Sequence, residues 1–171
     1  VEDLETKYEA YEYYMDAVKR DGVPYELIEK ALPTIEGEVN DILAQMVDFG
    51  IVLEMDGKNI NTYLAYDEDN IWPLELSSGM ERFISSLAMR VGLINVCNLP
   101  RANFLAIDEG FGNMDSDNLN SVYMLFQYLK SQFQFAFIVS HIESMRDTVD
   151  SLLEITKIKG FSNITLPSKF S

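Results

Sequence analysis

An apolar stretch that ends in two acids is the clearest candidate for chemistry in this chain. Residues 104–107 read Phe-Leu-Ala-Ile, which is typical of a buried strand, and Asp108 and Glu109 follow directly. Carboxylates at a sheet edge can hold Mg²⁺ through water and polarise a water that attacks a phosphate. The pattern predicts a metal-holding role for Asp108 and a catalytic role for Glu109. A strand ending in a solvated loop with two ordinary acids would look the same.

A loop of small residues precedes the helix expected over residues 79–95. It reads Leu76-Ser77-Ser78-Gly79-Met80, and Glu81 follows it. Backbone N–H groups at a helix N-terminus favour a phosphate, and Ser77 can add a hydroxyl. We expect this loop to be exposed. The alternative is a simple N-cap with Glu81 in the first helical turn.

The one histidine of the chain, His141, comes just after a buried strand expected over residues 133–139, in the run Phe137-Ile138-Val139-Ser140-His141. It follows the acidic strand by about 30 residues, the length of a strand–helix–strand unit. We therefore expect His141 beside Glu109, at the end of the sheet where open α/β sheets bind ligands. A lone histidine that only caps or packs is the alternative. Residues 110–115 predict a glycine-containing turn after the two acids; taken alone, an ordinary loop is the favoured interpretation.

Hydrophobic periodicity indicates the elements that position these residues. Helices are expected over residues 2–19, from 25 to about 48 with a kink or interruption at Pro33, over 79–95 and over 116–132, and a short one from 142. Strands are expected over 51–55 and 60–66 around an Asp56-Gly57 turn, over 103–107 and 133–139, and in a final hairpin around Gly160. The strand–helix–strand order after residue 103 implies parallel pairing.

Composition limits the function classes. The chain has 171 residues, 47% of them hydrophobic, enough for one domain with a real core. Its net charge of −15 argues against a general nucleic-acid-coating protein, and the excess lies in residues 1–70, with 18 acidic and 5 basic side chains. Cys97 cannot form an internal disulfide, which favours a reducing compartment, and we expect it to be buried. A single histidine excludes a multi-histidine metal site within the chain.

Together, in this order and spacing, the motifs resemble the C-terminal half of an ABC-type ATPase head. Residues 76–80 correspond to the signature loop, residues 104–109 to the Walker B strand, residues 112–115 to the D-loop and His141 to the switch histidine. The run Asp-Glu-Gly-Phe-Gly-Asn-Met-Asp from Asp108 resembles the SbcC-type DNA double-strand-break repair ATPases of the SMC-like group. Residues 21–46 are similar to the helix by which their coiled coil re-enters the head.

The resemblance implies a fold and a domain organisation. The fold class is α/β, the C-terminal lobe of a P-loop NTPase head of ABC type. It would have a mainly parallel sheet, antiparallel hairpins and coiled-coil-derived helices. Residues 1–48 would form the helical segment that comes from the coiled coil, and residues 49–171 the lobe.

The resemblance also implies an activity and its residues. ATP with Mg²⁺ would lie between two heads, with Asp108 as the metal residue and Glu109 and His141 as catalytic residues. Contacts to ATP, largely in trans, would come from Leu76, Ser77, Ser78, Gly79, Met80 and Asp115. No G-x-x-x-x-G-K-[ST] occurs in the chain, so ATP hydrolysis requires an N-terminal half that carries the P-loop.

The implied partners are that N-terminal half, a second head in a homodimer, an SbcD-type nuclease and double-stranded DNA, with no membrane and a cytoplasmic or nuclear location. Two departures from the family keep other readings open: Ser78 stands where Gly is usual, and Met80 where Gln or Glu is usual. One alternative is a non-catalytic dimerisation or regulatory half-head. Another is a condensin-like SMC head with the same chemistry and a different cargo.

Overall fold

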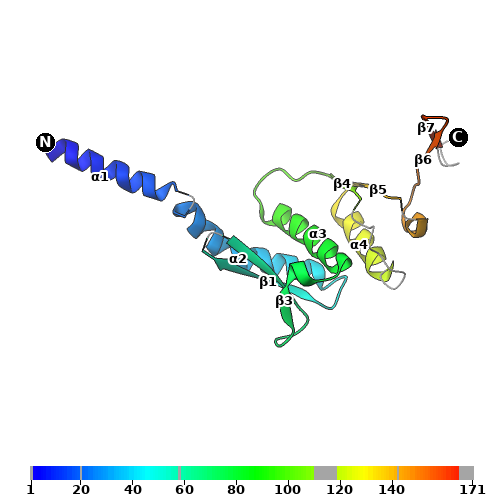
Figure 1. The fold of residues 1–171 in the computed structure, drawn as a ribbon, viewed down its shortest axis with the longest axis horizontal. Coiled ribbons are helices and arrows are strands. Elements are labelled where there is room, and N and C mark those ends of the chain that lie inside the picture. The colour runs from blue at the N-terminus through cyan, green and yellow to red at the C-terminus, as the bar shows by residue number, and fades with distance from the viewer. Residues whose placement is uncertain (1, 20, 58, 110–118, 142, 166–171) are drawn as a thin grey trace. The chain divides into compact units, whose positions relative to one another are not determined.

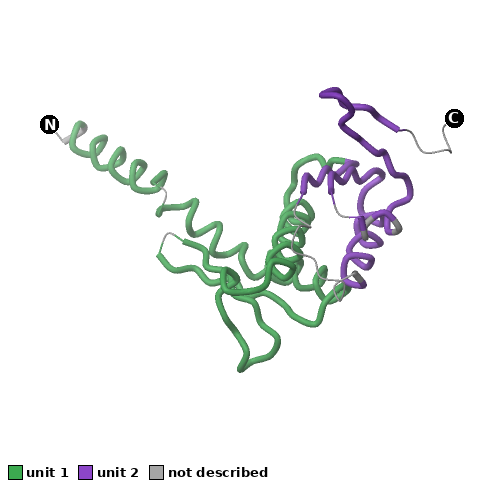
Figure 2. The backbone as a smooth tube through the Cα atoms, turned by 45° about the vertical axis from the view of Figure 1, so that its right-hand side comes forward, with its two compact units in different colours: residues 1–102 green, residues 103–171 purple. Residues whose placement is uncertain are grey.

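The computed structural model describes residues 2–19, 21–57, 59–109, 119–141 and 143–165. The chain folds into two compact units, residues 1–102 and residues 103–171 (Figure 2). Helices α1, α2 and α3 and the strands β1 to β3 belong to the first unit, and all later elements belong to the second (Figure 1). Among the described residues, no helix combines the length and apolarity needed to cross a membrane.

Two helices open the chain, α1 (Glu2–Ala17) and α2 (Val23–Leu43). A Cβ at Gly22 would lie 2.5 Å from the carbonyl oxygens of Asp16 and Ala17, so only glycine fits this tight connection. Pro24 lies in the first turn of α2, as expected. Pro33 lies inside α2 and does not interrupt it, so the expected interruption was wrong. The helix ends at Leu43, several residues before the expected end near residue 48.

Helix α2 packs closely along α3 (Gly79–Val96). Val39 of α2 is fully buried, and a Cβ on Gly92 of α3 would lie 2.8 Å from its Cγ2. Farther along the same contact, Asn95 Nδ2 donates a hydrogen bond of 2.6 Å to Glu38 Oε1. The absence of a side chain at Gly92 therefore allows the two helices to approach each other.

A three-stranded antiparallel sheet follows, made of β1 (Gly50–Asp56), β2 (Asn59–Ala65) and β3 (Ile71–Pro73), in that order. Gly57 turns the expected hairpin with φ of 57°. Side chains of α2 satisfy the outer edge of β1: Asn40 Nδ2 donates to the Ile51 carbonyl at 2.9 Å, and Asn40 Oδ1 accepts from the Ile51 N–H at 2.8 Å. The Leu53 N–H donates to Glu36 Oε2 at 2.7 Å. The helix thus covers an edge that would otherwise expose unpaired backbone groups.

The second unit begins with a strand–helix–strand unit, β4 (Phe104–Asp108), α4 (Leu119–Gln132) and β5 (Phe135–Val139). Strands β4 and β5 pair in parallel, from Phe104 opposite Phe135 to Asp108 opposite Val139, which confirms the expected direction. One face of this sheet is apolar and exposed; it carries Phe104, Phe135, Phe137 and Val139, each at least 42% exposed. The buried face of α4 carries Val122, Leu125, Phe126, Tyr128 and Leu129.

The chain continues through the 3-10 helix η3 (Glu143–Thr148) to a final hairpin, β6 (Glu154–Ile158) and β7 (Phe161–Thr165). Lys159 and Gly160 make its two-residue turn with φ of 52° and 89°, so the expected hairpin is confirmed. Every residue of β7 is exposed. Parallel pairing therefore accounts for one of the three described sheets, and the other two are antiparallel.

Candidate functional site

The two predicted acids lie where β4 ends. Asp108 is the last residue of the strand and Glu109 follows it, and both are exposed. The Glu109 N–H donates to the Val139 carbonyl at 2.9 Å, which extends the pairing of β4 with β5 by one bond. Glu109 has φ of 58°, in the left-handed region that L side chains rarely adopt. Such strain costs about 1–3 kcal/mol and concentrates at active sites and ligand clamps.

His141 lies beside Glu109, as the spacing predicted. Parallel pairing places the carboxyl ends of β4 and β5 at the same sheet edge, and His141 is the second residue after the end of β5. Its Nδ1 is 3.9 Å from Glu109 Oε1, and the two side chains are 74% and 70% exposed. This separation is too long for a direct hydrogen bond but leaves both groups open to a common ligand or water.

The segment of residues 76–80, called the signature loop below, runs from Leu76, the last residue of the 3-10 helix η1 (Leu74–Leu76), through Ser77 and Ser78 into the first turn of α3. Ser78 is the N-cap of α3: its Oγ accepts from the Glu81 N–H at 3.2 Å. Its own N–H donates to Glu81 Oε2 at 2.6 Å, which completes a capping box. The N-cap alternative is therefore realised, and it leaves the first N–H groups of α3 at a defined helix end.

Exposure divides the signature loop into two sets. Leu76 is 76% exposed and Ser78 is also exposed, so both can reach a partner molecule. Ser77 is only 8% exposed, and its Oγ donates to the Leu74 carbonyl at 2.7 Å. The expectation that the loop is exposed was therefore wrong at Ser77, because the turn of η1 brings a carbonyl within reach of its hydroxyl. It was also wrong at Met80, which is 6% exposed and belongs to the core. Gly79 is half-buried.

Sequence reasoning missed a further contact at this loop. Tyr66, just after β2, donates from Oη to Glu81 Oε1 at 2.6 Å. Burial raises the pKa of Glu81, but hydrogen bonds from Tyr66 and Ser78 outweigh it and leave that pKa below its ordinary value. The hydrogen bond to Glu81, with some burial, raises the pKa of Tyr66 to about 12. The two residues are 15 positions apart, so no short-range sequence pattern predicts their hydrogen bond.

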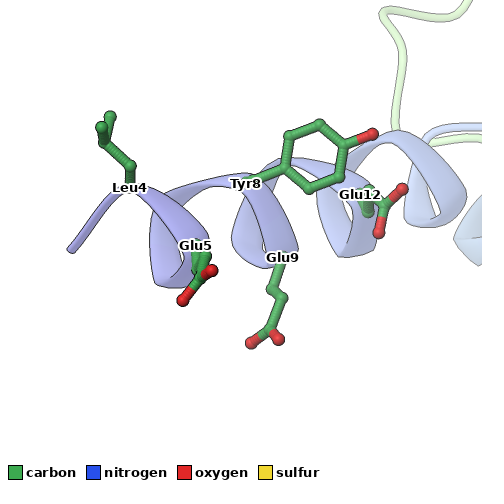
Figure 3. A pocket seen from close by; sticks show the side chains of 5 residues that line it. All are labelled: Leu4, Glu5, Tyr8, Glu9 and Glu12. Atoms are coloured by element: carbon green, nitrogen blue, oxygen red, sulfur yellow. The ribbon is translucent and has the colours of Figure 1, made fainter. Parts of the chain in front are cut away.

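The remaining predicted positions give a mixed result. Asp115 and the rest of residues 110–118 lie outside the described residues. Cys97 is exposed, so its expected burial was wrong; it follows the last residue of α3, where the chain leaves the helix. Within the described ranges, no three His, Cys, Asp or Glu side chains cluster to hold a metal ion on their own. A shallow hollow on α1 is lined by Leu4, Glu5, Tyr8, Glu9 and Glu12 (Figure 3), none of them a predicted site residue.

Comparisons with known proteins bear on this arrangement. No protein-family model matches the chain. It is 33% identical over 179 aligned positions to the uncharacterized protein R555 of Acanthamoeba polyphaga mimivirus, covering 95% of the chain and 13% of that protein. It is 28% identical to the DNA double-strand break repair Rad50 ATPase of Methanococcus maripaludis, covering 90% of the chain and 15% of that protein. With the SbcC component of the SbcCD nuclease of Deinococcus radiodurans it shares 32% identity over 51% of the chain and 10% of that protein.

Solved structures show the same fold. The Smc head domain with an extended coiled coil from Pyrococcus furiosus, bound to the C-terminal domain of ScpA, has a TM-score of 0.68 at 16% identity, over 99% of this chain and 43% of that one. A structure from work on the ATP-driven dimerization and DNA-stimulated activation of SMC ATPases also has a TM-score of 0.68. It is 15% identical, over 84% of this chain and 89% of that one.

These likenesses define the class: the fold is that of the ATPase heads of SMC proteins, a P-loop NTPase fold. In sequence, the chain is similar to Rad50 and SbcC, which supports its interpretation as the C-terminal half of an SMC-like, SbcC-type ATPase head. The chain spans between 10% and 15% of the length of the three curated relatives named above.

Proposed function

We propose that this chain forms half of an ATPase that hydrolyses ATP between two heads and drives DNA double-strand-break repair and DNA end processing. The single observation that carries the proposal is the geometry at Glu109. A carboxylate with left-handed backbone, φ 58°, directly follows a second acid and lies 3.9 Å from the one histidine of the chain. A strained, exposed acid beside a histidine at the carboxyl edge of a parallel pair is suited to orienting a water.

The residues take separate roles in this proposal. Asp108 is suited to Mg²⁺, which commonly uses one or two carboxylates and keeps several waters. Glu109 accepts the proton of the attacking water, and His141 contacts the same water or the phosphate it attacks. Bound ATP would supply the phosphoryl group. The backbone N–H of Gly79, at the N-terminus of α3, would meet the nucleotide of the opposite head, with Leu76 lining the approach.

The P-loop would come from an N-terminal half of the same ATPase, and the chain joined to that half is called the completed head below. The exposed apolar face of the β4–β5 sheet supports this. Phe104 and Phe135 lie opposite each other and are 56% and 58% exposed. In the hairpin of β6 and β7, Ile155 and Ile164 lie opposite each other and are 63% and 62% exposed. Surfaces this apolar are typical of an interface.

The proposed partners follow from the relatives. One relative is named for DNA double-strand break repair, and another as part of the SbcCD nuclease. We accordingly place an SbcD-type nuclease and duplex DNA with the completed head, which acts as a homodimer. The acidic surface of residues 1–70 leaves DNA contact to other parts of the assembly. An exposed free thiol at Cys97 fits a reducing compartment, cytoplasmic or nuclear.

A second candidate function is a non-catalytic half-head used for dimerisation or regulation. The observation that favours it is the buried Ser77, whose hydroxyl is committed to the Leu74 carbonyl. A signature loop without a free Ser77 hydroxyl would bind a phosphate through backbone groups alone.

Two variants of the completed head separate the candidates. Glu109→Gln keeps shape but cannot accept a proton, and loss of a positioned base costs on the order of 10²–10⁴ in rate. We expect ATP turnover to collapse while ATP-bound dimers accumulate, measured by phosphate release and light scattering. Turnover at the unmodified rate would refute the assignment of Glu109. Absence of any ATP turnover in the unmodified completed head would favour the second candidate.

Leu76→Arg tests the trans contact. Leu76 is 76% exposed, so the change should leave folding intact while placing a long cation between the heads. Leu99→Arg is the matched control, because Leu99 is 74% exposed and lies outside the signature loop. We expect ATP-dependent dimerisation to be lost in Leu76→Arg alone. Equal dimerisation in both variants would refute the role of the loop.

A further inference from the structure

Tyr66 is joined to the signature loop through one carboxylate. Its Oη donates to Glu81 Oε1 at 2.6 Å, while Glu81 Oε2 accepts from the Ser78 N–H, also at 2.6 Å. Both oxygens of Glu81 are therefore hydrogen-bonded, one to Tyr66 in the connection that follows β2 and the other to the signature loop. In an ordinary capping box the carboxylate accepts a hydrogen bond only from the N-cap residue of its own helix. Here a donor from another element selects its orientation.

Tyr66 is itself held on several sides. Its ring lies between Phe49, with ring centroids 5.6 Å apart, and Trp72, with centroids 5.5 Å apart. Its backbone N–H donates to the Asn70 carbonyl at 3.1 Å. The connection from β2 to β3 is further fixed by Asp67, whose Oδ1 accepts from the N–H groups of Asp69 and Asn70 at 3.0 and 2.9 Å. A donor with so few free torsions aligns its acceptor at little entropic cost.

The hydroxyl stays a donor under physiological conditions, because a tyrosine hydrogen-bonded to a carboxylate holds its proton well above neutral pH. The ion–hydroxyl bond is charge-assisted, and such bonds are shorter and stronger than neutral ones. Removal of the hydroxyl alone would leave Glu81 with one partner fewer and free to leave the Ser78 N–H.

We infer that Tyr66 is a positioning residue for the signature loop: through Glu81 it holds the Ser78 backbone in place, and so orients the adjacent Gly79 N–H toward the nucleotide of the opposite head. This inference rests on the proposed function, in which that loop acts in trans. Tyr66 contacts no nucleotide and acts only through Glu81. It would therefore govern how two heads engage and leave untouched how one head holds its own ATP.

The test compares Tyr66→Phe with Tyr63→Phe in completed heads that also carry Glu109→Gln, so that bound ATP is not consumed. Tyr63 is the control because it is a half-buried tyrosine on β2, three residues before Tyr66, and no hydroxyl contact of Tyr63 enters the network. Three quantities are measured: the ATP affinity of dilute single heads, the dissociation constant of the ATP-bound dimer, and amide hydrogen exchange at Ser78 and Gly79.

For Tyr66→Phe we expect unchanged ATP affinity of single heads, a dimer dissociation constant raised about three- to tenfold, and exchange at Ser78 faster by a similar factor, the range set by the net worth of one hydrogen bond. Tyr63→Phe should match the parent in all three. A dimer and an exchange pattern equal to the parent's in Tyr66→Phe would overturn the inference. A general loss of folding would instead lower single-head ATP affinity as well, and that result would also overturn it. Failure of the parent itself to dimerise with ATP would refute the proposed function and the inference with it.

Discussion

Removal of the Asn40 side chain should destabilise the first unit by breaking two hydrogen bonds at once. Asn40 donates to the Ile51 carbonyl at 2.9 Å and accepts from the Ile51 N–H at 2.8 Å. Ile51 is 1% exposed, so water does not readily replace either bond. Asn40→Ala therefore leaves a buried donor and a buried acceptor without partners on an edge strand.

The magnitude follows from the cost of those two groups. Each buried polar group that loses its partner costs about 1–3 kcal/mol. Because Asn40 is itself only partly buried, some water can enter, and we expect a combined loss of about 2–4 kcal/mol. Against a total stability of roughly 5–15 kcal/mol for a typical domain, this is a large fraction.

The assay is urea-induced unfolding of the completed head followed by circular dichroism, with amide exchange at Ile51 as a local readout. Gln45→Ala is the control, because its amide donates to the Asp41 carbonyl from an exposed position and its loss should cost less than about 0.5 kcal/mol. A loss for Asn40→Ala no greater than for Gln45→Ala, with unchanged exchange at Ile51, would refute the view that α2 seals the edge of β1.

Three further outcomes are expected. The chain without an N-terminal half should show no micromolar ATP binding by calorimetry, since the P-loop supplies most phosphate contacts; micromolar binding would contradict this. Gly92→Ala should lower the free energy of unfolding by about 1–3 kcal/mol, because the new Cβ would lie 2.8 Å from Val39 Cγ2. The control is Gly37→Ala, which should be neutral or stabilising because a Cβ there would have nothing within 4 Å. Equal effects of the two substitutions would argue against close packing of α2 on α3. Because the pKa of Tyr66 is raised to about 12, its hydrogen bond to Glu81 contributes its full stabilisation below about pH 10 and loses it as the pH rises toward 12. The free energy of unfolding should therefore fall more steeply with pH over that interval in the parent than in Tyr66→Phe. Parallel curves for the two proteins would show that this hydrogen bond does not stabilise the fold.

Periodicity predicted the elements well where apolar spacing was regular. The hairpins at Gly57 and Gly160 and the parallel pair β4–β5 followed from turn residues and from strand–helix–strand order. Of the kink or interruption expected at Pro33, the interruption does not occur, since packing of α2 against α3 and β1 keeps the helix continuous despite one missing N–H. Its C-terminus was placed too late because no glycine marks it. Backbone bonds such as that from the Met46 N–H to the Leu43 carbonyl at 2.9 Å tighten the chain there.

The candidate site was predictable only where topology alone determines proximity. Glu109 and His141 come together because parallel strands end at one edge, whatever their side chains do. The burial of Ser77 depends on the 3-10 turn of η1, and short apolar stretches do not reveal such turns. The bond from Tyr66 to Glu81 depends on the path of the β2–β3 connection, which side-chain patterning leaves undetermined.

The hairpin of β6 and β7 has a consequence for how the protein must be made. Ile155 and Ile164 pair on one of its faces, and Ile158 and Phe161 pair on the other, all at least 56% exposed. A two-stranded ribbon with an exposed apolar pair on each face and with exposed edges is a template for aggregation. If the proposed N-terminal half is translated first, it is already available when this ribbon leaves the ribosome and can cover it at once. The time during which other chains can pair with the exposed ribbon is then short. Yield of soluble protein should therefore depend on the order of synthesis of the two halves.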